Sequence, residues 1–284
     1  DSLDDKIDSL YYYMQYLKKS LSQTFHGIKK KPGLFLSLAA LQLVLIVILA
    51  TLVLGFQIKI LEDVESIMTA VEGANTNPEL IDAGQPFLQD TALILQSYKS
   101  MIKNTFQMIL WSLLIFLILN SILWTGSHSI LSEKFSWRLW KTYCLQYITA
   151  TLIVTTPYII LIWIFSKQIT SLAISPGSIN TWGTTFTVLF IIFYFLLLNS
   201  AAALTSSWKK WPKKIFVTTI KKLPKTLMVL LINLAILGSI LYGLYMVLTF
   251  TELAWLVVIL TIIVVSVLIL TRIFWIAALN NEKN

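Results

Sequence analysis

Six apolar runs, each long enough to cross a lipid bilayer, contain almost no charge. A helix needs ~20 apolar residues to span the ~30 Å hydrocarbon core. Lipid offers no hydrogen-bond partners to the backbone, so runs of this length must be helical. They lie at about Leu34–Phe56, Thr105–Trp124, Tyr143–Phe165, Gly183–Leu204, Thr226–Thr249 and Leu253–Ala278. The sequence therefore predicts an all-α polytopic membrane protein with six transmembrane helices.

The composition supports this class. The chain has 284 residues, of which 57% are hydrophobic and 13% are charged, whereas soluble domains carry ~25% charged residues. A single cysteine, Cys144, excludes an internal disulfide and a cysteine metal site. We interpret it as a small packing residue near the start of the third span.

The distribution of lysine and arginine predicts the orientation, because these residues stay on the cytoplasmic side of short loops. They concentrate before the first run, between the second and third, and between the fourth and fifth. Half of the 14 acidic residues lie in the segment 57–104, between the first and second runs. We therefore expect both termini in the cytoplasm and, for the whole chain, residence in a prokaryotic cell membrane.

The N-terminal segment has its apolar residues at helical spacing. The stripe contains Leu3, Ile7, Leu10, Met14, Leu17, Leu21, Phe25 and Ile28. Spacings of three and four place these residues on one face of a helix. Two interpretations stay open: a helix lying at the inner membrane surface, or a coiled-coil helix that docks a partner. We divide the chain into this cytoplasmic-side helix, 1–30, and a six-helix membrane domain, 31–284.

The segment 57–104 forms the one sizeable outer loop. Apolar residues repeat at helical spacing in both of its halves, and breaker residues gather at 73–86. We expect the first two transmembrane helices to continue outward as an extracytoplasmic helical hairpin with its turn in this region. Such a hairpin is more often a spacer or a partner contact than a catalytic domain.

A basic aromatic patch lies between the fourth and fifth runs. Its residues are Trp208, Lys209, Lys210, Trp211, Lys213, Lys214, Lys221 and Lys222. Basic clusters beside a membrane attract anionic lipids by ~1 kcal/mol per residue. The patch is therefore a candidate site for anionic lipids or a partner, and it is equally explained as an ordinary topology signal. Nucleic acid is not an expected partner at this position.

Some of these features are similar to a known group of proteins. The basic Lys-Pro sequence before the first span (Lys29 to Phe35), paired spans around inner loops with tryptophan and serine, and the total of six spans carry the likeness. The chain resembles a loose superfamily of poorly characterised six-helix prokaryotic membrane proteins, including the membrane domain fused to some glycerophosphodiesterases. The resemblance implies the six-helix fold over about residues 20–279 and carries over no catalytic residues.

The residues needed for most enzyme chemistry are missing. The two histidines, His26 and His128, have no carboxylate or cysteine at metal-ligand spacing. Ser127 precedes His128, but a serine nucleophile also needs an oxyanion hole and usually an orienting carboxylate. No Asp or Glu lies within a span, which argues against transport coupled through a buried carboxylate. We expect a protein that is not an enzyme and that uses no metal or cofactor.

One polar layer interrupts the spans. Each of the first five spans carries one amide 5–14 Å, roughly, inside the cytoplasmic boundary, and the sixth carries an arginine at similar depth. The layer contains Gln42, Asn120, Gln146, Asn199, Asn233 and Arg272. It is explained either by hydrogen bonds between helices or by a polar cavity open to the cytoplasm, with Arg272 as its charged anchor.

These features leave two functions open. The first is a transport or permease-type subunit that uses the polar layer and docks a cytoplasmic ATPase through 129–142 and 206–222, as in six-helix export permeases. The second is a membrane scaffold or assembly factor that binds another membrane protein. It would act through the N-terminal helix, the basic loop and the outer hairpin.

Overall fold

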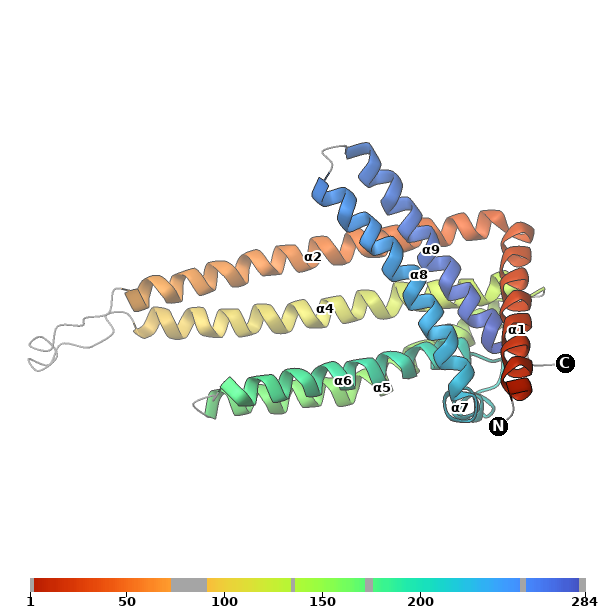
Figure 1. Ribbon diagram of the computed structural model, residues 1–284. Coiled ribbons are helices and arrows are strands. Elements are labelled where there is room, and N and C mark those ends of the chain that lie inside the picture. Colours follow the sequence, from red (N-terminus) through yellow and green to blue (C-terminus); the bar gives the residue numbers. More distant parts are fainter. Residues whose placement is uncertain (1–2, 73–90, 134–135, 172–175, 251–253, 281–284) are drawn as a thin grey trace, which may run out of the picture. The chain divides into compact units, whose positions relative to one another are not determined.

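The computed structural model describes residues 3–72, 91–133, 136–171, 176–250 and 254–280, and within these ranges every regular element is helical (Figure 1). The elements are α1 (Leu3–Lys30), α2 (Pro32–Glu72), α4 (Thr91–Leu131), α5 (Trp137–Ser171), α6 (Pro176–Ala202), α7 (Trp211–Phe216), the π-helical turn η1 (Val217–Lys221), α8 (Leu223–Phe250) and α9 (Ala254–Asn280). Among them, six are long and apolar enough to cross a membrane, namely α2, α4, α5, α6, α8 and α9. The predicted all-α fold is confirmed, and the protein is a polytopic membrane protein.

The chain divides into two compact units. One contains Asp1–Gln42 with Asn120–Asn284, and the other contains Leu43–Leu119. Helix α1 packs against α9, so the N-terminal helix belongs to the same compact unit as most of the spans. The expected boundary at residue 30 stays a prediction.

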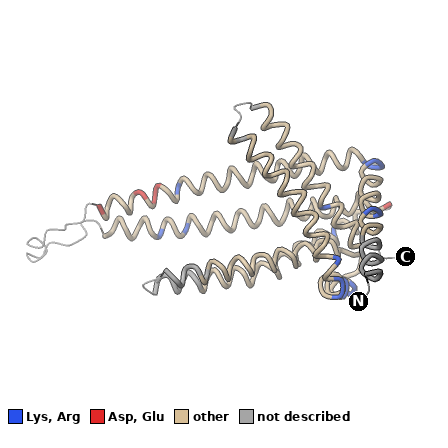
Figure 2. Tube along the Cα trace, viewed as in Figure 1, with Lys and Arg blue, Asp and Glu red and all other residues tan. Residues whose placement is uncertain are grey.

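The second unit holds α2 from Leu43 to its end and α4 from its start to Leu119. Each of these helices has 41 residues and is therefore about 60 Å long, twice the hydrocarbon thickness. Asn104 of α4 donates a hydrogen bond to Asp63 of α2 at 3.0 Å, and acidic residues on α2 run beside lysines on α4 (Figure 2). The expected helical extensions over 57–72 and 91–104 are confirmed. The expected turn at 73–86 lies outside the described residues.

In the first unit, neighbouring spans pack in pairs. Tyr158 of α5 has its ring 6.1 Å or less from the rings of Phe186 and Phe193 of α6, and α8 lies beside α9 (Figure 1). The buried core of this unit is one cluster that contains Trp275 and Ile276 of α9 together with residues from α4, α5, α6 and α8.

Helix α1 lies across the C-terminal end of α9 (Figure 1). The Tyr16 hydroxyl donates to the carbonyl oxygen of Ala278, and the Lys225 ammonium lies 5.5 Å from the centre of the Tyr16 ring. The buried face of α1 consists of Ser20, Thr24 and Gly27. Both hydroxyls donate to carbonyls one turn earlier in α1, so they are satisfied without leaving the helix.

Only part of the apolar stripe predicted on α1 packs against the bundle. Leu17 packs against the core, whereas Met14, Leu21 and Phe25 are 62%, 43% and 52% exposed. At 100° per residue these three lie about 100–140° around the helix from Ser20. The side chains of Leu3, Ile7 and Leu10 lie outside the described residues. The exposed part of the stripe remains available to lipid or to a partner.

A polar layer beneath a lysine-lined pocket

Arg272 joins three helices in the interior of the first unit. Its Nη2 atom donates to Oε1 of Gln42 on α2 at 3.2 Å and to Oδ1 of Asn120 on α4 at 3.1 Å. Gln42 and Asn120 are 7% and 6% exposed. The structure thus brings together three of the six residues predicted for the polar layer.

Two aromatic residues complete this cluster. The Asn120 amide donates to the Tyr147 hydroxyl on α5, and the Arg272 guanidinium lies 5.2 Å from the centre of the Trp124 ring. A cation over a tryptophan face gains about 0.5–2 kcal/mol, more when desolvated. We call Gln42, Asn120, Trp124, Tyr147 and Arg272 the Arg272 cluster.

The Arg272 cluster holds its charge without a carboxylate. No acidic residue contacts Arg272 in the part of the chain that the structure describes. Its Nη1 atom is buried and makes no hydrogen bond to any described residue. A buried polar group without a partner costs about 1–3 kcal/mol, and more when it is charged. The cluster therefore contains a buried cation, Arg272, whose hydrogen-bonding capacity is only partly satisfied by the described residues.

The other three predicted layer residues have different surroundings. Asn199 is 0% exposed, and neither its amide nitrogen nor its amide oxygen bonds to a described residue. Asn233 is 7% exposed, and its oxygen likewise has no partner among the described residues. Gln146 does not join Arg272; its Oε1 accepts the backbone N–H of Thr205 at 3.1 Å.

Three polar side chains converge on the C-terminal end of α6. His128 Nε2 bonds to the Ala201 carbonyl at 2.9 Å, and a carbonyl only accepts, so Nε2 carries the proton. Lys214 of α7 donates to the Leu204 carbonyl at 3.3 Å, and Gln146 holds Thr205. Carbonyl groups at the C-terminus of a helix lack donors within the helix, and His128 and Lys214 supply donors at this end. His128 lies in the last turn of α4.

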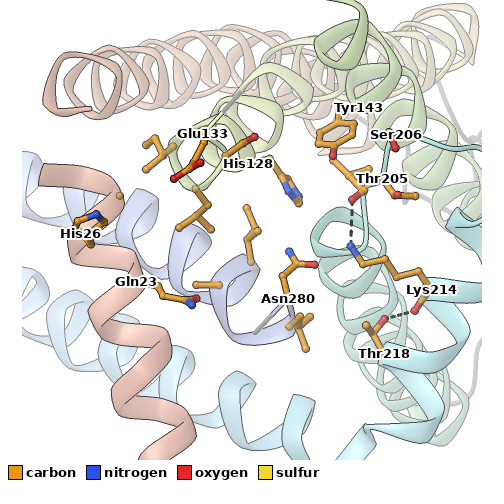
Figure 3. A pocket seen from close by; sticks show the side chains of 18 of the residues that line it. Gln23, His26, His128, Glu133, Tyr143, Thr205, Ser206, Lys214, Thr218 and Asn280 are labelled. Carbon is orange, nitrogen blue, oxygen red and sulfur yellow. Dashed lines mark hydrogen bonds between the residues drawn. The ribbon is translucent and has the colours of Figure 1, made fainter. Parts of the chain in front are cut away.

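A pocket of about 1090 Å³ lies beside this helix end (Figure 3). Its walls come from α1, the C-terminal ends of α4 and α9, Tyr143 near the start of α5, the 204–206 loop, and the segment 210–222 that contains α7 and η1. Figure 3 shows Gln23 and His26 on one side, His128 on another, and Lys214 with Thr218 across from α1. The pocket lining mixes hydroxyl, amide and ammonium groups with apolar side chains such as Ile276 and Leu279.

The pocket lies one helical turn from the Arg272 cluster on three helices. His128, Tyr143 and Ile276 line the pocket. Four residues away on the same helix faces lie members of the Arg272 cluster. The pairs are His128 with Trp124, Tyr143 with Tyr147, and Ile276 with Arg272. One turn is about 5.4 Å. The cluster is therefore the next layer of side chains beneath the pocket floor.

The charges around the pocket are mostly positive. Among the described lining residues, Lys30, Lys210, Lys214 and Lys222 face one carboxylate, Glu133. Lys30 and Glu133 pair at 3.8 Å, and both are well exposed. Burial, and next the charge of Lys225, lower the pKa of Lys222 below its ordinary value. A nearby anion would favour the charged form of this lysine.

The basic aromatic patch is split by the fold. Lys210, Lys214 and Lys222 line the pocket, whereas Lys209, Lys213 and Lys221 do not. Trp211 is only 5% exposed, whereas Trp208 is 44% exposed, and their rings meet edge to face at 5.6 Å. Trp211 therefore packs inside the protein, and Trp208 remains on the surface.

Sequence reasoning missed Trp124, Tyr147 and His128 as members of the site. Trp124 lies one helical turn after Asn120, so helical spacing from this amide could have identified Trp124. Tyr147 directly follows Gln146, and this spacing gives no such signal. The C-terminal capping role of His128 had no sequence signal, because it depends on where α6 ends.

No cluster of metal-ligating side chains occurs among the described residues. Ser127, beside His128, donates its hydroxyl to the Leu123 carbonyl at 2.8 Å, as a helical serine commonly does. No family model matches the chain, and no curated protein or solved structure is significantly similar to it.

Proposed function

We propose that this protein is a transport-type membrane subunit, without catalytic residues of its own, whose polar pocket faces the cytoplasm. One observation carries the proposal: the pocket floor and the Arg272 cluster occupy successive turns of the same three helices. A solute entering the pocket needs to pass one layer of side chains to reach a buried cation.

The energetics of the layer support this function. An ionisable residue within a span is expensive and is by default a functional candidate. Arg272 has one unsatisfied nitrogen, and Asn199 has an unsatisfied amide, each judged against the described residues. Hydrogen bonding between helices explains the contacts to Gln42 and Asn120, but not these open groups. Water or a polar solute would satisfy them.

The orientation and partners of this subunit follow from its charges. Lysines gather on α1 and on α7 with η1 (Figure 2). By the positive-inside rule this end faces the cytoplasm, with both termini on that side. The exposed Trp208, Lys209 and Lys213 then form a docking surface for a cytoplasmic ATPase.

Thiol accessibility tests the proposal. Cys144 is replaced by serine to remove the native thiol. Asn199 is then replaced by cysteine, and this second substitution breaks no described side-chain hydrogen bond. We expect this thiol to react with a small, negatively charged methanethiosulfonate reagent added to inverted vesicles. The reaction should be slower with the positively charged reagent of similar size, because Arg272 and the pocket lysines repel it.

Val229→Cys is the matched control. Val229 is also 0% exposed, but it belongs to the apolar core, so its thiol should stay unreactive. Equal reactivity at positions 199 and 229 would reject the transport-type function, since the layer would then be dry packing.

One observation favours the alternative of a scaffold or assembly factor. Leu61, Met68 and Leu95 of the second unit are each more than half exposed. Charged neighbours such as Glu65 and Lys99 keep this part of α2 and α4 out of the hydrocarbon. Exposed apolar side chains there suit a protein partner. Their joint replacement by serine should remove a co-purifying membrane protein while leaving protein stability unchanged; an unaltered set of co-purifying proteins argues against the scaffold.

A further inference from the structure

The lysines of the pocket outnumber its acidic residues. Lys214 belongs to α7, Lys210 directly precedes α7 and Lys222 directly follows η1. Glu133, the carboxylate of the described lining, lies beside Lys30. The lining therefore has a net positive charge. An anion is the class of ligand that such a surface attracts.

The spacing of these lysines is specific. Positions 210, 214 and 218 are one helical turn apart, and Thr218 lies between the lysines at 214 and 222 in the lining. The neighbours Lys209 and Lys213 carry the same charge but line no part of the pocket. The fold thus selects alternate members of one basic run and directs them to a common cavity.

The remaining lining defines the ligand further. Hydroxyl and amide groups of Ser22, Gln23, Ser206 and Asn280 offer hydrogen bonds, and Ile276 and Leu279 give an apolar floor. A volume of about 1090 Å³ lies at the upper end of small-molecule pockets. The space suits a tetrahedral oxyanion joined to an organic body. Lysine ammonium groups bind phosphate as point charges.

We propose that this pocket binds a phosphate-bearing anion, supplied either by an anionic lipid headgroup or by a soluble phosphate ester. The phosphate lies between Lys210, Lys214 and Lys222, and the organic body lies over the floor formed by α9. The inference deepens the proposed function, on which it rests for the cytoplasmic orientation of the pocket, and it names the ligand class of the same site.

Binding by the purified full chain in a neutral detergent tests the site. The probes are phosphatidic acid and glycerol 3-phosphate, with phosphatidylcholine as the zwitterionic comparison, and retained molecules are counted by native mass spectrometry. Replacing Lys210 and Lys214 by glutamine should weaken binding about thirtyfold, at about fivefold per lysine. Lys210→Gln alone, which keeps the Lys214 bond to Leu204, should weaken it about fivefold.

The matched control removes the same charge from the same run. Lys209→Gln with Lys213→Gln should leave the affinity within about twofold. Equal weakening by both pairs would overturn the proposal, because it would show general surface attraction. Absence of binding by both phosphate probes would overturn it as well.

The two probes separate the sources of the phosphate. Retention of phosphatidic acid but not glycerol 3-phosphate identifies a lipid headgroup, and retention of both identifies a site for soluble esters. The test is also separable from that of the proposed function. Phosphate binding with an unreactive thiol at position 199 rejects transport and keeps the site; a reactive thiol without binding rejects the phosphate site and keeps transport.

Discussion

The guanidinium of Arg272 donates a hydrogen bond to the side-chain oxygen of Gln42, 3.2 Å away and 230 positions earlier in the chain. The same nitrogen also bonds to Asn120, so one cation ties the last span to the first two. No carboxylate among the described residues neutralises the charge of Arg272. Its hydrogen bonds therefore both hold the helices together and leave a positive charge in the polar layer. Variants that separate these two roles are the most informative.

Replacing Arg272 by leucine should lower the free energy of unfolding by about 1–3 kcal/mol. The buried side-chain oxygens of Gln42 and Asn120 lose their donor, and an unsatisfied buried acceptor carries this penalty. The measurement is reversible unfolding in detergent or lipid discs. The triple variant with leucine at positions 42, 120 and 272 removes the polar groups together and should recover wild-type stability or exceed it. Recovery of stability with lost solute handling would assign the cluster to function.

Replacing Lys31 by methionine should destabilise the protein by about 1–2 kcal/mol. Its Nζ atom donates to the carbonyl oxygens of Ser129 and Ser132 at 2.5 Å each, and a cation stabilises the C-terminus of a helix. Lys30→Met is the neighbouring control with the same change of charge. Lys30 meets Glu133 at 3.8 Å on the surface, a pair expected to contribute little. Similar thermal stability of both variants would contradict the capping role of Lys31.

Replacing Gly27 by leucine should detach α1 from the bundle. A Cβ atom at this position would lie 3.2 Å from Cγ2 and 3.3 Å from the carbonyl oxygen of Ile130, and overpacking of this kind costs about 1–3 kcal/mol. Limited proteolysis should then cut α1 earlier than in the wild type. Gly33→Leu is the control, because no described heavy atom lies within 4 Å of a Cβ there. Unchanged cleavage in Gly27→Leu would show that α1 is not held at this contact.

The exposed stripe of α1 should contact lipid. In a Cys144→Ser background, a spin label at Leu21 or Phe25 should collide more with oxygen than with a water-soluble nickel chelate. Oxygen concentrates in the acyl region, and apolar faces of interfacial helices lie at its boundary. A label at Ser22, which lines the pocket, should show the reverse preference. Higher nickel accessibility at all three positions would instead favour a soluble partner helix.

The sequence predicted the spans well because crossing a bilayer is a local requirement. Each run needs only its own length and composition to be helical in lipid, and all six runs became helices of the structure. The continuation of α2 to Glu72 and of α4 from Thr91 was also predictable, since the apolar spacing of 57–72 and 91–104 is helical on its own.

The sequence predicted less about α1. Its helical state followed from the spacing of three and four, but the packed face did not, because Ser20, Thr24 and Gly27 are not apolar. They pack there since small side chains allow close approach, and since both hydroxyls are satisfied within the helix. Hydrophobic spacing instead identified the stripe of α1 on which Met14, Leu21 and Phe25 stay exposed.

The sequence by itself determined the class of this protein and the depth of its polar residues, because both depend only on position along each span. Tertiary structure decided which of those residues meet. Arg272 reaches Gln42 and Asn120, Gln146 turns to Thr205, and Lys210 and Lys214 line a pocket from which Lys209 and Lys213 are excluded. These outcomes depend on how each helix is rotated about its axis and where it ends, and packing against distant segments fixes both.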